Sequence, residues 1–163
     1  FVEKFKDTRD NCMVVSPDLG SVTRARNFAQ RFEAPLAIVD KRRPEPNKSE
    51  IMNIIGNIEG KHCILVDDMI DTAGTLAKAA NVLKEMGAKS VRACATHPVL
   101  SGPAYERLAE SALEEIIVAD TIPLSNDPAK DKSKITVLSM SDIFADIIDK
   151  VYNYEEISSS FIN

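Results

Sequence analysis

Short apolar runs alternate along the chain with amphipathic stretches. Apolar residues recur at helical spacing in Ser21–Phe32, whereas Cys63–Val66 is continuously apolar, as in a strand buried on both faces. Repeated strand–helix alternation predicts an α/β fold, a Rossmann-like parallel sheet with helices on both faces. The predicted strands are Cys12–Ser16, Pro35–Val39, Lys61–Val66, Ser90–Ala95, Glu115–Ala119 and Ile135–Leu138, and the predicted helices are Ser21–Phe32, Thr75–Met86, Pro103–Ser111 and Ser141–Tyr154.

Two segments, 51–55 and the last predicted helix, need separate comment. The segment Ile51–Ile55 fits either a short helix or a strand. The last predicted helix has an apolar stripe that we expect to face the core. Its members are Ile143, Phe144, Ile147, Ile148 and Val151.

The clearest chemical signal follows the buried strand that we predict to end at Val66. Two acids, Asp67 and Asp68, come next, and then a loop of acid, hydroxyl and small residues opens a helix. Backbone N–H groups and the positive end of a helix dipole suit a phosphate, and open α/β sheets bind ligands at such strand ends. Carboxylates repel phosphate but suit hydroxyl groups, so the segment predicts a sugar-phosphate site. Its loop residues are Asp71, Thr72, Ala73, Gly74 and Thr75.

Two other interpretations fit the same letters. The spacing Asp67-Asp68-x-x-Asp71 also occurs on helices whose acids bridge magnesium, although Gly74 and the preceding apolar run disfavour a continuous helix. The segment could also be a plain strand-to-helix turn with Asp71 or Thr72 as the N-cap and no ligand. That interpretation leaves two acids at a strand end without partners.

A second candidate site follows the strand Cys12–Ser16. Gly20 and Ser21 open a helix whose N–H groups, near Arg24 and Arg26, suit an anion such as diphosphate. Asp18 is then explained as a ligand for Mg2+, which would neutralise the phosphates. A turn aspartate with Ser21 as the N-cap is the alternative.

A basic run, Lys41-Arg42-Arg43, follows the predicted strand Pro35–Val39. Composition alone favours a solvated loop. Its position after a strand places it at the same sheet edge as Asp18 and Asp67, where mobile cations could close over a transferring phosphoryl group.

Composition limits the class of protein. The chain has 163 residues, 44% of them hydrophobic, and a net charge of -5, which argues against a nucleic-acid surface. Its three cysteines lie in apolar runs and are expected to be reduced core thiols of a cytoplasmic protein. No stretch predicts a membrane span.

Several separate motifs resemble those of one family, the ribose-phosphate pyrophosphokinases of bacterial type, which share the type I phosphoribosyltransferase fold. They occur in that family's order and cover most of residues 13–122. One departure is Ser21, which stands where the family usually has a second glycine. The motifs are Val15–Gly20, Asp40–Pro44, Val66–Thr75 and Thr96–Ala104.

The resemblance implies a function for the intact protein. It implies Mg2+-dependent transfer of diphosphate from ATP to the 1-hydroxyl of ribose 5-phosphate, with Lys41 and Arg43 stabilising the transition state. It also implies a regulatory phosphate at Ser101 and Gly102, and a homo-oligomer, a hexamer in the family. A type I phosphoribosyltransferase and a non-catalytic, synthetase-associated regulatory subunit remain the alternatives.

The resemblance further implies that residues 1–163 form the C-terminal domain of a two-domain synthetase. The N-terminal domain would then be absent from this chain, which begins at Phe1. We expect this chain alone to be inactive, because the adenine pocket would lie largely in the missing domain and in a neighbouring subunit.

Overall fold

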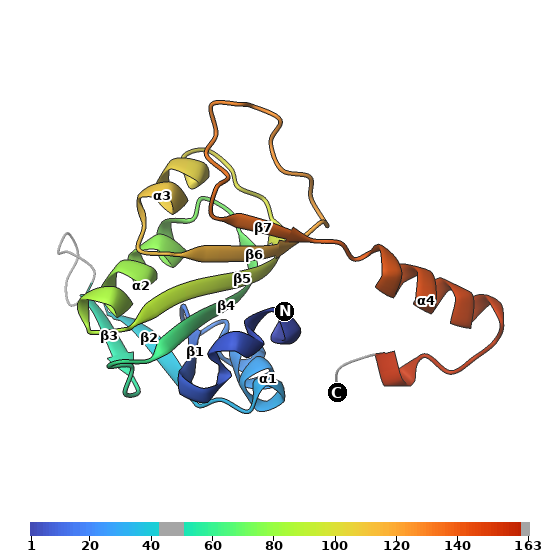
Figure 1. Ribbon diagram of the computed structural model, residues 1–163, viewed down its shortest axis with the longest axis horizontal. Coiled ribbons are helices and arrows are strands. Elements are labelled where there is room, and N and C mark those ends of the chain that lie inside the picture. Colours follow the sequence, from blue (N-terminus) through green and yellow to red (C-terminus); the bar gives the residue numbers. More distant parts are fainter. Residues whose placement is uncertain (43–50, 161–163) are drawn as a thin grey trace.

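A single mixed sheet organises the structure, a computed structural model that describes residues 1–42 and 51–160 (Figure 1). Within these residues the strand order is β3-β2-β1-β4-β5-β6-β7, and all neighbours pair in parallel except β2 and β3. The strands are β1 (Cys12–Ser16), β2 (Leu36–Arg42), β3 (Ile51–Ile55), β4 (His62–Ile70), β5 (Ser90–Pro98), β6 (Glu115–Ala119) and β7 (Ile135–Leu138). The helices are α1 (Val22–Phe32), α2 (Gly74–Glu85), α3 (Ala104–Glu110) and α4 (Ser141–Tyr152), with 3-10 helices η1 (Val2–Asn11) and η2 (Ser158–Ser160).

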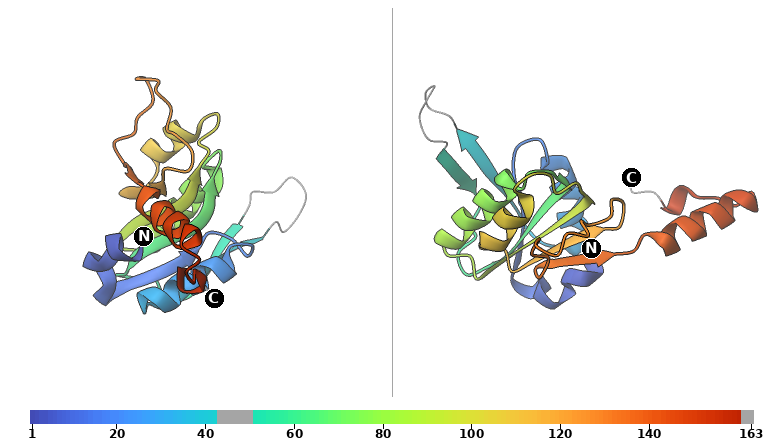
Figure 2. Two further views of the ribbon diagram at one scale, coloured as in Figure 1. Left: turned by 90° about the vertical axis from the view of Figure 1, so that its right-hand side faces the viewer. Right: turned by 90° about the horizontal axis from the view of Figure 1, so that it is seen from above.

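The alternating side chains of β4 show how helices come to cover both faces of the sheet. Cys63 and Leu65 belong to the apolar cluster under α2 and α3, whereas Ile64 and Val66 belong to the cluster under α1 and η1. All four are less than 5% exposed, as the unbroken apolar run predicts. Figure 1 and Figure 2 show α2 and α3 on one face and α1 with η1 on the other. The predicted α/β fold with helices on both faces is confirmed.

Three strands differ from their predicted bounds. Strand β4 continues through Asp67 and Asp68 to Ile70, rather than ending at Val66, because its ladder with β5 continues past the acids. Strand β5 likewise continues to Pro98.

The ambiguous segment 51–55 is a strand, β3, which pairs antiparallel with the extended end of β2. The backbone of Lys41 and Arg42 is therefore part of β2, and the prediction that the basic run begins in a loop was wrong.

The strand order reverses its direction between β1 and β4. The chain passes from β1 to β2 on one side and later returns to place β4 on the other side of β1. Ligands of open α/β sheets bind at such a point, beside the carboxyl ends of the strands. Both candidate site segments, after β1 and at the end of β4, meet there.

Helix α4 was predicted to pack on the sheet, but it does not. It extends beyond the end of β7 (Figures 1 and 2), and none of its residues is buried. Its Ile143, in the first turn, lines a cavity together with residues of η1 and α1. Ile148 is 66% exposed and Phe144 57% exposed. The expectation that the apolar stripe of this helix faces the core of the sheet was wrong. Helical spacing identifies an apolar face, but tertiary structure decides what covers that face.

Candidate functional site

The loop between β4 and α2 has the geometry of an anion site. Helix α2 begins at Gly74, and no described side chain makes a capping hydrogen bond at its N-cap residue, Ala73. Ala73 has a φ of 58°, in the left-handed region that non-glycine residues rarely adopt. An uncapped helix start leaves N–H groups for another acceptor. Ala73, and not Asp71 or Thr72, is the N-cap residue, so that part of the alternative interpretation is wrong, while the sugar-phosphate site stays a prediction.

The turn after β5 holds this loop in place. The N–H of Leu100 donates to the Ile70 carbonyl at 2.9 Å, and the N–H of Ser101 donates to the Asp71 carbonyl at 3.1 Å. The Ser101 hydroxyl also donates to the Asp71 carboxylate. In this structure Ser101 thus orders the loop. Its predicted regulatory role, together with Gly102, stays a prediction.

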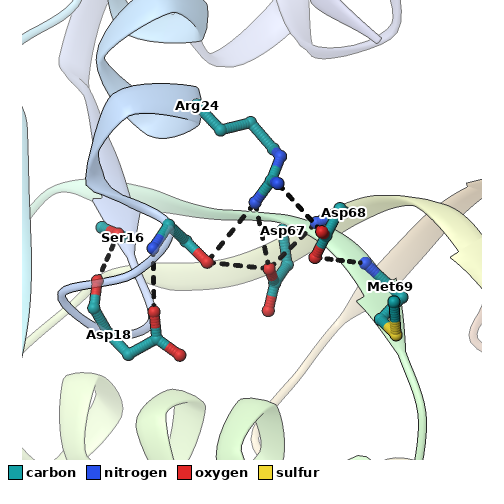
Figure 3. Close-up of polar contacts among 7 residues, drawn as sticks. Ser16, Asp18, Arg24, Asp67, Asp68 and Met69 are labelled. Atoms are coloured by element: carbon teal, nitrogen blue, oxygen red, sulfur yellow. Dashed lines mark hydrogen bonds and ion pairs between the residues drawn. The ribbon is translucent and has the colours of Figure 1, made fainter.

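Asp67 and Asp68 form a polar cluster with the start of α1 (Figure 3). One oxygen of Asp67, Oδ1, accepts the Ser21 hydroxyl at 2.8 Å and the Asp68 N–H at 2.9 Å. Arg24 pairs with both acids, at 3.4 Å from Asp67 Oδ1 and 2.9 Å from Asp68 Oδ2. The acids lie on a strand, so the interpretation of helical acids bridging magnesium is wrong.

The two acids titrate differently. Burial raises the pKa of Asp67, against the lowering effect of its hydrogen bonds from Ser21 and the Asp68 N–H. Burial also acts to raise the pKa of Asp68, but the hydrogen bond with Asp67, the charge of Arg24 and two backbone N–H groups outweigh it. The pKa of Asp68 is therefore lowered. Asp68 is the more exposed acid, with 47% of its side chain accessible against 19% for Asp67.

A cavity of about 170 Å³ is lined by six of the seven residues predicted to bind the sugar phosphate, all but Asp68. It is bounded by the loop on one side and by the end of β1 on the other, and sequence-distant Asp18 and Asp67 both line it. The structure therefore brings the predicted sugar-phosphate loop and the predicted magnesium ligand together. The residues lining the cavity are Asp18, Asp67, Met69, Ile70, Asp71, Thr72, Ala73, Gly74, Thr75 and Leu76.

Both polar hydrogens of Ser21 already have acceptors within the protein. Its N–H donates to Asp18 Oδ1 at 2.9 Å, and its hydroxyl donates to Asp67 Oδ1. Ser21 is 5% exposed, and neither it nor Gly20 lines the cavity. Their assignment to a diphosphate or to the ATP phosphates stays a prediction.

The donor set at Asp18 fits a magnesium ion only together with a substrate. Mg2+ usually takes one or two protein carboxylates, with substrate phosphates and water completing its shell. No group of three or more His, Cys, Asp or Glu side chains able to hold a metal occurs in residues 1–42 and 51–160. Asp18, with Asp67 on the same cavity, provides carboxylate oxygens beside the predicted phosphate loop, and this is the kind of donor Mg2+ prefers.

The predicted catalytic cations are only partly located. Lys41 lies near the end of β2, where its backbone pairs with Met52 of β3. Arg43 lies outside the described residues. Their catalytic role stays a prediction.

The remaining candidates have structural roles. Cys12, Cys63 and Cys94 are free, and burial raises the pKa of each to about 12, so none is a thiolate near neutral pH. His97 lies in β5, and its Nδ1 is 2.9 Å from the Thr121 hydroxyl.

Sequence reasoning missed one residue of the site and misjudged another. Arg107 of α3 donates to the Thr72 carbonyl at 2.9 Å, and no motif singled it out because it lies 35 positions away along the chain. Arg24 was grouped with the anion-binding cations, yet it pairs with the two acids. Only the packing of α1 and α3 against the sheet shows these contacts.

A mostly parallel sheet, with an uncapped helix start and paired acids at its switch point, defines an α/β domain of the phosphoribosyltransferase class. Solved structures agree. Phosphoribosylpyrophosphate synthetase from Mycobacterium smegmatis superposes with a TM-score of 0.81 and 43% identity, covering 93% of this chain and 48% of that chain. Orotate phosphoribosyltransferase from Aeropyrum pernix gives a TM-score of 0.56 at 20% identity, covering 86% of this chain and 67% of that chain, and shares the fold.

Sequence comparison gives the family. The model of the phosphoribosyl synthetase-associated domain matches residues 39–162, and the chain belongs to this family. It is 57% identical over 161 residues to the ribose-phosphate pyrophosphokinase of Clostridium perfringens, covering 99% of this chain and 50% of the relative. It is 58% identical over 160 residues to that of Clostridium tetani, covering 98% of this chain and 49% of the relative. The chain therefore spans about half the length of the curated relatives it matches.

A search of the helices in the described part of the chain finds none with the length and hydropathy needed to cross a membrane.

Proposed function

We propose that this chain is the ribose 5-phosphate-binding part of a ribose-phosphate pyrophosphokinase. The cavity that joins the uncapped start of α2 with Asp67 and Asp18 carries the proposal. The relatives that match nearly the whole chain bear that enzyme's name. The full protein would transfer diphosphate from ATP to the 1-hydroxyl of ribose 5-phosphate and release AMP. The assignment of this chain to the C-terminal half of the protein is part of the proposal.

The residues of the cavity, together with the neighbouring Asp68, have separate roles in binding the sugar phosphate. The N–H groups and hydroxyls of Thr72–Thr75, with the dipole of α2, hold the 5-phosphate. Asp67 and Asp68 accept hydrogen bonds from the ribose hydroxyls, and Arg24 keeps the two carboxylates in place. A phosphate at one end and carboxylates at the other select a phosphorylated sugar over phosphate or sugar alone.

The transfer step needs positive charge near the phosphates. A Mg2+ ion held by Asp18 and by substrate oxygens would neutralise the phosphate charge. Lys41 and Arg43 would stabilise the charge that develops on the transferring group. Asp67 and Asp68, as acceptors, would orient the sugar so that its 1-hydroxyl faces the donor.

Calorimetry on this chain tests the binding site. We expect ribose 5-phosphate to bind more tightly than ribose or inorganic phosphate. Thr75→Val should weaken both phosphate-bearing ligands. Asp68→Asn should weaken ribose and ribose 5-phosphate but not inorganic phosphate, by about tenfold or more, because a hydrogen bond to a charged group is worth about 1.5–3 kcal/mol. Thr23→Val, the same change on the exposed side of α1, is the control and should alter none of the three affinities. A folded sample that binds none of the three ligands at millimolar concentration would contradict the proposal.

The reaction itself is tested in a protein extended to the length of the relatives. Lys41→Ala and Arg43→Ala should each lower kcat by orders of magnitude with small changes in KM, because these cations act mainly in the transition state. Arg42→Ala, which removes the same charge from the neighbouring position, is the control and should change kcat far less. AMP formation without added nucleobase separates this activity from that of a phosphoribosyltransferase. The 163-residue chain alone should form no AMP.

A further inference from the structure

A groove between α2 and α3 lies behind the phosphate loop. It has a volume of about 530 Å³ and shares Thr72, Gly74 and Thr75 with the smaller cavity in front of the loop. Ala73 lines only the front cavity, and Arg107 lines only the rear groove. The loop Thr72–Thr75 therefore separates the front cavity from the rear groove, and we call it the wall between them.

The guanidinium of Arg107 fixes the direction of one peptide group in this wall. Arg107 Nη1 donates to the Thr72 carbonyl at 2.9 Å, so this oxygen points into the rear groove. Every peptide bond described is trans. In a trans peptide the C=O and the following N–H point in opposite directions. The Ala73 N–H therefore points away from Arg107, toward the front cavity.

This direction matters for an anion. A carbonyl oxygen that faced the front cavity would repel a phosphate there, whereas an N–H donates to it. The conformation needs support, because the backbone of Ala73 is left-handed, which is strained for a residue with a Cβ. A Cβ added at Gly74 would lie 3.3 Å from Arg107 Nη1, so the arginine packs directly against this part of the wall.

We propose that Arg107 is a positioning residue for the sugar-phosphate loop, holding the Thr72 carbonyl in the rear groove so that the Ala73 N–H faces the bound phosphate. Arg107 itself stays on the far side of the loop and does not touch the ligand. The phosphate ligand in this statement rests on the proposed function, while the effect of Arg107 on the loop conformation does not.

The test uses this chain with Arg107→Gln and Arg107→Lys, and with Glu106→Gln on the same helix as the control. Calorimetry with inorganic phosphate and with ribose 5-phosphate gives affinities, and the amide resonances of Ala73 and Gly74 report the loop conformation. We expect Arg107→Gln to shift both resonances and to weaken both ligands about tenfold or more, the usual effect of losing a charged hydrogen bond. Arg107→Lys should recover part of the affinity, and Glu106→Gln should change nothing.

The outcomes separate the two proposals. If Arg107→Gln leaves the Ala73 and Gly74 resonances and both affinities unchanged, the positioning role is overturned and the proposed function stands. If the parent chain binds neither ligand but Arg107→Gln still shifts the two resonances, the proposed function fails and the effect on the loop stands. A general loss of resonance dispersion in Arg107→Gln would show that this variant is unfolded. Arg107→Lys then decides the question. The positioning role is retained if folded Arg107→Lys shows shifted loop resonances and weaker binding of both ligands, and it is overturned otherwise.

Discussion

At the residue scale, Asp67 and Asp68 are neighbours with opposite contributions to stability. The pKa of Asp67 is raised, chiefly by burial, so its ionisation opposes folding. This loss of folding stability is absent below the ordinary aspartate pKa, and it develops as the pH rises through the folded-state pKa. The pKa of Asp68 is lowered, so its ionisation favours folding above the ordinary pKa, and the gain is lost as the pH falls through the folded-state value.

Asp67→Asn should therefore raise the free energy of unfolding near neutral pH, because the amide keeps an oxygen to accept the Ser21 hydroxyl and removes the buried charge. Asp68→Asn should lower the free energy of unfolding, because it weakens the contact with Arg24. Urea unfolding near neutral pH and at about pH 4, close to the ordinary aspartate pKa, checks both expectations. Each difference from the parent should shrink at the lower pH. A destabilised Asp67→Asn near neutral pH would contradict this account of the pair.

At the element scale, the length of β4 places the acids. Because pairing with β5 continues through Met69 and Ile70, Asp67 and Asp68 lie on a strand, and Arg24 of α1 reaches both carboxylates. A loop in this place would leave the acids without the ladder that orients them. The strand is thus part of the site.

The turn after β3 offers a test of packing between elements. Gly56 has a φ of 129°, and a Cβ there would lie 2.8 Å from the Cβ of Ala37 in β2. Gly56→Ala should lower the free energy of unfolding by roughly 3 kcal/mol, from strain and overpacking together. Gly60→Ala is the matched control, since Gly60 also has a positive φ, 67°, but nothing lies within 4 Å of its added Cβ. It should cost about 1 kcal/mol. Equal losses in urea unfolding would contradict the role of Ala37.

At the scale of the whole molecule, α4 presents an apolar face to solvent. Phe144 and Ile148 are more than half exposed, and exposed apolar patches favour association. We expect this chain to self-associate, and Phe144→Ser with Ile148→Ser to reduce that association, measured by light scattering across a concentration series. The free energy of unfolding should change by less than about 0.5 kcal/mol, as is usual for exposed positions.

Asp146→Ser, on the same helix, is the control for this prediction. Its exposed carboxylate pairs with Lys150, so this change leaves the apolar face intact. Self-association should persist in that variant. Association unchanged by the double substitution would show that another surface is responsible.

Most of the elements could be predicted from the sequence alone, and so could a candidate chemistry for the central loop. Unbroken apolar runs marked β1 and β4 because a strand buried on both faces excludes polar side chains. The predicted helix Thr75–Met86 agrees with α2 to within one residue at each end, and Gly87, which follows it, has a φ of 92° that suits a residue without a Cβ. Thr72–Thr75 predict an anion site from the sequence because their donors are local to one loop.

Which residues these local features contact depends on how the strands and helices pack, and this could not be predicted from the sequence. Asp18 and Asp67 line the same cavity because β1 and β4 are neighbours in the sheet. For the same reason Ser21, which follows β1, donates a hydrogen bond to Asp67 although the two residues are 46 positions apart. Arg107 reaches the Thr72 carbonyl because α3 packs beside α2. The apolar stripe of α4 was visible in the sequence, but its exposure was not, because burial depends on what else lies against a helix.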